Sequence, residues 1–139
     1  MNSPATPDPN ARHYGVADVM LSSTGRLARL PFAMGAAALF ALAWLYEWHV
    51  PANVHRWTAF VFWCAILFSL ACLLSKRLHD RNRRGWWAFA PVFALIGVWP
   101  QPEGLFGMIC LVVLAFFGAE LFFQPSRKGF NRFGPPPKR

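Results

Sequence analysis

The sequence predicts an all-α membrane protein, a bundle of four transmembrane helices with both termini in the cytoplasm. The first observation is composition: 55% of the 139 residues are hydrophobic, more than the interior of a soluble domain of this size can bury. The second is that these residues gather in runs long enough to cross a bilayer. The third is that all of the 14 Lys and Arg residues except Arg56 fall on one side of a four-span topology, and basic flanks are retained in the cytoplasm.

The chain opens with a polar segment, residues 1–13, whose prolines and short polar side chains predict a disordered tail. The transmembrane domain is predicted over residues 14–124. Its first eight residues, YGVADVML at 14–21, carry apolar residues at a spacing typical of a short interfacial helix on the membrane surface. A plain linker is the alternative interpretation of this stretch.

The first two spans are predicted at about 30–48 and 57–75. The first is rich in small residues and ends in aromatic ones, as expected where a helix reaches the headgroup region. Small residues recur there every four positions, at Ala33, Ala37 and Ala41. This repeat predicts a smooth face against which a neighbouring helix can pack closely. The second span has about nineteen residues without a formal charge, enough to cross about 30 Å of hydrocarbon.

The third span, predicted at about 84–99, is the shortest apolar run. From Trp86 to Trp99 it has about fourteen residues, fewer than a membrane helix normally needs. Its reach increases if Arg83 and Arg84 extend their side chains from the first turn to the headgroups. Pro91 predicts a kink. A re-entrant segment is the alternative, although it would place basic segments on opposite sides of the membrane.

The fourth span is predicted at about 105–123, after a short PQPEG turn that lacks basic residues and suits an outer hairpin. The segment that follows, 125–139, is basic and rich in Gly and Pro, so it cannot continue the helix. Three basic flanks then share the cytoplasmic side: Arg12, Arg26 and Arg29; Lys76, Arg77, Arg81, Arg83 and Arg84; and Arg127, Lys128, Arg132, Lys138 and Arg139.

The charged loop between the second and third spans is the main candidate site. If the second helix continues past Ser75, one side of it carries, at three- and four-residue spacings, Lys76, Arg77, Asp80, Arg81 and Arg84. Asp80 is then surrounded by cations and can form pairs at either spacing. His79 and Asp80 do not form a plausible acid–base dyad, because adjacent side chains on a helix point about 100° apart. With no Ser or Cys nucleophile nearby in sequence, we expect no catalytic residues and no enzyme activity.

The sequence predicts no cofactor, no metal site and no binding of nucleic acid. The four histidines fall on both sides of the membrane in the predicted topology, and the cysteines lie inside apolar runs without metal-ligand spacing. The net charge of +8 is explained by basic residues that flank apolar runs and face anionic headgroups.

Glu120 is an intramembrane acidic residue, about one turn from the cytoplasmic end of the fourth span. A charge at this depth is costly unless it faces protein, water or a partner. Arg26, Arg29 and Arg77 are expected at the same depth, which favours a structural salt bridge. A proton- or cation-binding residue of a transport path is the alternative.

Three motifs together resemble a known family: Gly25-Arg26-Leu27-Ala28-Arg29 before the first span, Lys76-Arg77-Leu78-His79-Asp80 continuing to Gly85-Trp86-Trp87, and Gly129-Phe130-Asn131-Arg132-Phe133-Gly134-Pro135 near the end. In this order the chain resembles the small bacterial inner-membrane proteins of domain of unknown function 805, over roughly residues 14–137. The resemblance implies a cytoplasmic-membrane protein of about four helices, and brings no established activity, substrate or cofactor. The chain departs from the family pattern at Leu30-Pro31-Phe32 and at Arg84.

The motifs lead to one hypothesis about the inner face. Each is basic, cytoplasmic and next to a helix end, so their polar side chains are expected to converge into one cluster that joins the helix ends or binds a phosphate headgroup. The candidate cluster is Arg26, Arg29, Arg77, His79, Asp80, Asn131 and Arg132. We therefore expect a structural or interaction role in the bacterial inner membrane, with anionic lipid headgroups, a protein partner or a second copy as the ligand. A small oligomeric transporter or channel subunit is the alternative.

Overall fold

Every regular element in the described part of the chain is helical. The computed structural model describes residues 15–99, 101–126, 129 and 131–133. In chain order the elements are α1 (Val16–Leu21), α2 (Arg29–His49), α3 (Ala52–Asp80), the 3-10 helix η1 (Gly85–Ala88), α4 (Phe89–Val98) and α5 (Gly104–Phe123). The all-α prediction is confirmed, and α1 occupies the stretch where a short helix was predicted. The predicted tail over residues 1–13 lies outside the described residues, as do Gly134 and Pro135.

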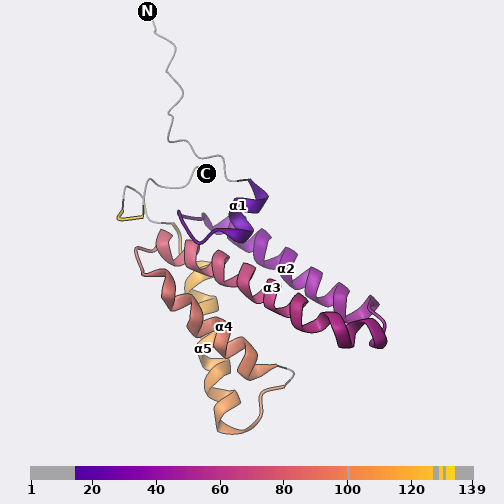
Figure 1. Ribbon diagram of the computed structural model, residues 1–139. Helices are drawn as coiled ribbons and strands as arrows, with labels where there is room; N and C mark the ends of the chain where they lie inside the picture. The colour runs from indigo at the N-terminus through magenta and orange to yellow at the C-terminus, as the bar shows by residue number, and fades with distance from the viewer. Residues whose placement is uncertain (1–14, 100, 127–128, 130, 134–139) are drawn as a thin grey trace, which may run out of the picture.

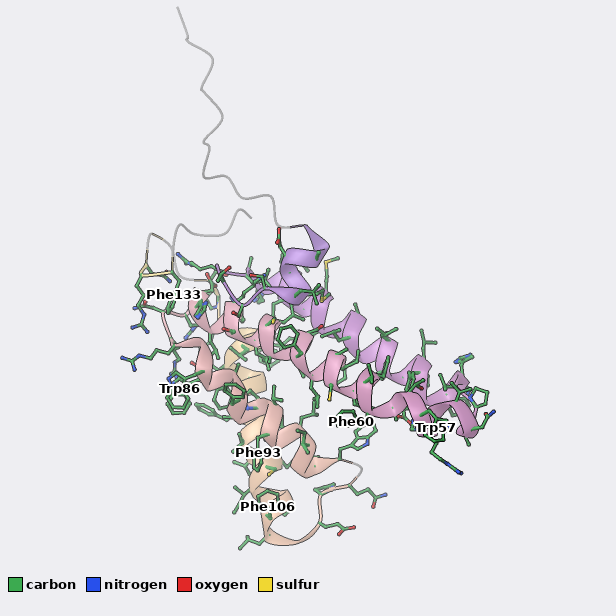
Figure 2. All side chains as sticks on the ribbon, viewed as in Figure 1. Trp57, Phe60, Trp86, Phe93, Phe106 and Phe133 are labelled. Carbon is green, nitrogen blue, oxygen red and sulfur yellow. The ribbon has the colours of Figure 1, made fainter. Side chains whose placement is uncertain are left out.

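Three of the helices are long and apolar enough to cross a membrane. These are α2, α3 and α5, with mean hydropathies of 1.4, 2.2 and 2.4 over their most apolar stretches. Many of their large apolar side chains point away from the protein, among them Trp57 and Phe60 of α3 and Phe106 of α5 (Figure 2). Trp57 is 83% exposed and Phe60 is 80% exposed, which suits contact with lipid rather than water.

The predicted third span is shorter than the other three. It consists of η1 with 4 residues and α4 with 10, which together reach about 23 Å. The hydrocarbon core is about 30 Å thick, so η1 and α4 together are about 7 Å shorter than a full crossing. Pro91 lies in the first turn of α4, directly after the 3-10 turn, where a missing backbone N–H is tolerated.

The helices form two hairpins that share one end. Figure 1 shows α2 and α3 running side by side, and α4 and α5 running together in a different direction. The hairpins meet beside α1, where the main core is buried. The most completely buried apolar side chains in this core are Leu27, Phe32, Leu73, Leu78 and Leu121.

The contact between α2 and α3 uses a different face from the predicted one. Ala37 and Ala41 are exposed, whereas Gly35 and Ala36 are buried. A Cβ atom at Gly35 would lie 3.1 Å from the side chain of Leu73. The close approach of α2 to α3 therefore depends on Gly35 and Ala36. The alanines that repeat every four positions do not form this contact face.

Candidate functional site

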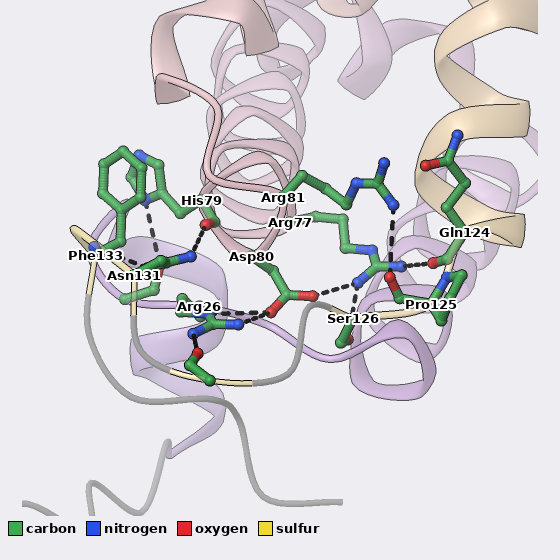
Figure 3. Close-up of polar contacts among 12 residues, drawn as sticks. Arg26, Arg77, His79, Asp80, Arg81, Gln124, Pro125, Ser126, Asn131 and Phe133 are labelled. Carbon is green, nitrogen blue, oxygen red and sulfur yellow. Dashed lines mark hydrogen bonds and ion pairs between the residues drawn. The ribbon is translucent and has the colours of Figure 1, made fainter.

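Asp80 is the centre of a buried polar network at the end of α3. Its side chain is fully buried, and Oδ1 accepts hydrogen bonds from Nε of Arg26 at 3.1 Å and from Nη2 of Arg26 at 3.0 Å. Oδ2 accepts from Nη1 of Arg77 at 2.7 Å (Figure 3). Arg77 precedes Asp80 by one helical turn, the spacing at which the pair was expected. One carboxylate thus joins α3 to the segment before α2.

Arg77 also binds the C-terminal end of α5. Its Nε donates to the carbonyl of Leu121 at 2.9 Å and its Nη2 to the carbonyl of Gln124 at 2.5 Å, and Nη1 donates to Oγ of Ser126 at 3.1 Å. The last carbonyls of a helix have no partner within it and carry a partial negative charge. The buried guanidinium of Arg77 donates hydrogen bonds to these carbonyls and offsets their partial negative charge. Arg77 therefore caps the C-terminal end of α5 while it pairs with Asp80.

The segment near the end of the chain contacts the same network. Nη1 of Arg26 donates to the carbonyl of Gly129 at 2.7 Å. Nδ2 of Asn131 donates to the carbonyl of His79 at 2.9 Å, and Oδ1 of Asn131 accepts from the backbone N–H of Phe133 at 2.9 Å. The carbonyl of His79 also accepts the backbone N–H of Asn82 at 2.9 Å, so Asn131 adds a second hydrogen bond to the last turn of α3.

His79 lies between the first and last of the three motifs. Its Nδ1 is 3.2 Å from the carbonyl of Gly25, and because a carbonyl can only accept, Nδ1 must carry the proton. Its ring stacks on Phe133, with centroids 3.9 Å apart and planes 12° apart. Figure 3 shows Phe133 beside His79 at the edge of the network. Phe133 was not among the predicted residues, because an aromatic residue in a basic tail gives no signal of stacking.

The loop after α3 passes close to the helix that it leaves. Asn82 has a positive φ of 61°, a conformation that Asn tolerates better than most residues. A Cβ atom at Gly85 would collide with Oγ of Ser75 and would lie 2.7 Å from Nε2 of His79. The glycine therefore lets η1 begin directly against α3, which explains one residue of the middle motif.

Two of the predicted residues are exposed, and only one of them, Arg132, contacts the cluster. Arg132 is exposed; its Nη2 donates to the carbonyl of Asn82 at 3.0 Å and its guanidinium lies 4.8 Å from the centroid of Phe133. Arg29 is also exposed, and it forms no hydrogen bond or ion pair with the residues that the structure describes. The structure therefore brings together all of the predicted residues except Arg29.

Lys76 is a buried residue that the sequence placed on the same side of the helix as Asp80 but that was not included in the candidate cluster. Its side chain is fully buried, and Nζ donates to the carbonyl of Asp18 in α1. Lys76 precedes Asp80 by four residues, which places both on one face of α3. That spacing was a usable signal, but a lysine near a helix end normally faces headgroups.

Glu120 forms a separate pairing between α5 and the loop after α3. Its side chain is 6% exposed, and Oε1 lies 3.1 Å from Nη2 of Arg83 and 3.9 Å from Nη2 of Arg81. Oε2 of Glu120 and Nε of Arg81 are buried without a hydrogen-bond partner in the described part of the chain. The residues expected near Glu120 were Arg26, Arg29 and Arg77; the observed ion pairs are instead with the loop arginines.

The network contains more buried positive than negative charge. Arg26, Arg77 and Lys76 are all buried; the two arginines share the carboxylate of Asp80, whereas Lys76 donates to the carbonyl of Asp18. Backbone carbonyls at helix ends offset part of the excess, since each accepts a charge-assisted hydrogen bond. Both oxygens of Asp80 accept hydrogen bonds from guanidinium groups. The described residues also hold no group of three His, Cys, Asp or Glu side chains that could bind a metal ion.

Comparison with known proteins identifies a family. The model of the family described as "Protein of unknown function (DUF805)" matches residues 20–135, which includes the whole polar network. Neither a curated protein nor a solved structure matches the chain.

Proposed function

The chain belongs to the DUF805 family, and on that basis we propose that it is an integral protein of the bacterial inner membrane whose basic cytoplasmic face binds anionic lipid headgroups. In this proposal the chain crosses the bilayer four times, with both termini in the cytoplasm. Its role is structural and interactive rather than catalytic. The observation that carries the proposal is the buried network around Asp80, because it holds three basic segments together at one end of the helices.

The topology is supported by the lengths of the helices and by where their ends meet. Arg77 joins the end of α3 to the end of α5, so these two ends lie on the same side of the membrane. The 20 residues of α5 span about 30 Å, so its start belongs on the opposite side. The chain between α3 and α5 must then cross as well, using η1, α4 and the residues that follow. Four crossings satisfy this requirement.

The headgroup-binding face is supported by exposed basic residues next to exposed tryptophans. Arg84 is exposed beside Trp86 and Trp87, which are 57% and 42% exposed and stack with centroids 4.7 Å apart. Tryptophan favours the headgroup region, and arginine binds phosphate through several donors. Among the described residues, the exposed arginines of this face are Arg29, Arg83, Arg84 and Arg132.

Cysteine labelling in intact cells tests the topology. The three native cysteines, Cys64, Cys72 and Cys110, are first replaced by alanine. In this background we expect a membrane-impermeant maleimide to label Asn53→Cys, between α2 and the body of α3, and to leave Arg84→Cys unlabelled until the cells are opened. Labelling of Arg84→Cys in intact cells would contradict the proposed orientation.

Lipid binding tests the role of the basic face. The double variant Arg29→Gln/Arg84→Gln removes two exposed arginines that form no ion pair with the described residues. Each basic residue near an anionic surface contributes about 1 kcal/mol, so affinity for phosphatidylglycerol in neutral detergent micelles should fall about tenfold or more. Arg56→Gln is the matched control, since Arg56 is exposed at the opposite end. Equal affinity of the wild type, the double variant and the control for phosphatidylglycerol would exclude the proposed face. If instead a protein or a second copy co-purifies with the wild type and is lost in the double variant, the face belongs to that partner.

A further inference from the structure

A second feature, far from the Asp80 network in the fold, is a pocket between α2, α3 and α4. Its volume is about 840 Å³, within the range of about 300–1,000 Å³ typical of small-molecule sites. The side chains that line it come from both hairpins. Six of these residues matter for the proposal: Ala43 and Glu47 of α2, Trp63 and Leu67 of α3, Ile96 of α4, and Trp99 directly after α4.

The surroundings of the pocket favour an apolar occupant. Its walls are almost entirely aliphatic and aromatic, and it is partly open. Two of the helices that form it, α2 and α3, are long and apolar enough to cross a membrane. The medium outside such helices is hydrocarbon, so an acyl chain can enter from the side. Water would find too few hydrogen-bond partners on walls of this kind.

One end of the pocket carries a fixed negative charge. Glu47 is the one charged side chain among the described residues that line it. Its Oε1 lies 3.2 Å from Nε1 of Trp63, which donates to it, and 3.2 Å from Nε2 of His55. The ring of Trp63 lies 5.6 Å from that of Trp99 across the pocket. These contacts hold the carboxylate of Glu47 at the pocket. Because the Glu47 side chain is still 36% exposed, the carboxylate can accept a further hydrogen bond.

We propose that this pocket binds one phospholipid with an ammonium headgroup, of the phosphatidylethanolamine class, with an acyl chain between the hairpins and the amine donating to Glu47. Charge complementarity selects this class, because a carboxylate attracts an ammonium group and repels a lipid whose headgroup is only anionic. The proposal rests on insertion of the protein in a membrane. It does not depend on the basic face at the other end of the helices.

Native mass spectrometry tests occupancy of the pocket. The full chain is purified in neutral detergent micelles that contain equal amounts of phosphatidylethanolamine and phosphatidylglycerol. The wild type should retain one phosphatidylethanolamine per monomer. Ala43→Trp fills the pocket and should lose it, whereas Ala38→Trp, the same substitution on the opposite face of α2, should keep it. Equal retention by the two variants, or no lipid on the wild type, would overturn the proposal.

Headgroup selectivity is tested by Glu47→Gln. The amide still accepts a hydrogen bond from Trp63 but carries no charge. The preference for phosphatidylethanolamine over phosphatidylglycerol should fall about tenfold, the contribution of one charge-assisted hydrogen bond, while total occupancy is kept. An unchanged lipid preference in Glu47→Gln would overturn the role of Glu47. If the wild type is a dimer and Ala43→Trp is a monomer, the pocket is occupied by a second copy of the chain. Arg29→Gln/Arg84→Gln should leave this lipid bound, so failure of the basic face and failure of the pocket are distinguishable.

Discussion

Arg26 and Asp80 are 54 residues apart in the sequence and form a buried ion pair, with Nε and Nη2 of Arg26 both donating to one carboxylate oxygen. The pair joins the segment before α2 to the last residue of α3. Because the other oxygen of Asp80 accepts from Arg77, and Arg77 caps α5, one carboxylate is linked to three helix ends. The stability of the shared end of the two hairpins should therefore depend strongly on Asp80.

Replacement of this carboxylate should destabilise the protein. In Asp80→Asn the amide presents one acceptor and one donor group to two guanidiniums that need acceptors, so at least one buried cation is left unpaired. Removing one partner of a buried ion pair typically costs about 3–5 kcal/mol. Thermal unfolding in detergent, followed by circular dichroism, measures the effect. Glu103→Gln, at an exposed position, is the control, and a melting temperature equal to that of the control would contradict the importance of Asp80.

Arg77 and Asp80 should be energetically coupled. Arg77→Leu removes both the ion pair and the cap of α5, so its own cost does not measure the pair. A double-mutant cycle with Asp80→Ala separates the two contributions, since the loss of the cap is common to both arms. Residues in contact normally show coupling of about 0.5–3 kcal/mol. Additive losses for the single variants would show that the observed contact contributes no net coupling.

Sequence patterns predicted the helices better than their ends. Long uncharged runs identify α2, α3 and α5, because hydropathy reports burial in hydrocarbon directly. The same measure does not report where a helix begins or stops. The third span was predicted at about 84–99, but its start is a 3-10 turn at Gly85–Ala88, which depends on close packing of Gly85 against α3. Such packing is a tertiary effect that composition does not encode.

The site was predictable where local spacing and the family resemblance supplied the contacts. The pairing of Arg77 with Asp80 follows from their separation along one helix, whereas the participation of Arg26 and Asn131 came from motifs recognised together. The burial of Lys76 was not predicted because it depends on a carbonyl of α1, 58 residues earlier. Nothing near Lys76 in the sequence signals that partner.

Gly85 should be intolerant of a side chain. In Gly85→Ala the new methyl group meets Oγ of Ser75 and Nε2 of His79, so η1 must move away from α3 or the histidine must leave Gly25 and Phe133. Forcing extra volume into a packed site typically costs about 1–3 kcal/mol. Gly118→Ala in α5 is the matched control, because a Cβ there has no neighbour within 4 Å, and a helical Gly→Ala change is normally stabilising by about 0.5–1 kcal/mol. Equal unfolding temperatures for the two variants would contradict the close approach.

The positive φ of Asn82 gives a prediction with an internal comparison. Asn82→Gly should keep or slightly increase stability, because glycine adopts a φ of 61° without steric cost. Asn82→Val should lose about 1–2 kcal/mol, because a β-branched residue is strained in the left-handed region. The side chain of Asn82 is exposed, so lost burial does not confuse the comparison. Thermal unfolding of both variants measures the difference in stability. A valine variant as stable as the glycine variant would show that residue 82 does not adopt a positive φ.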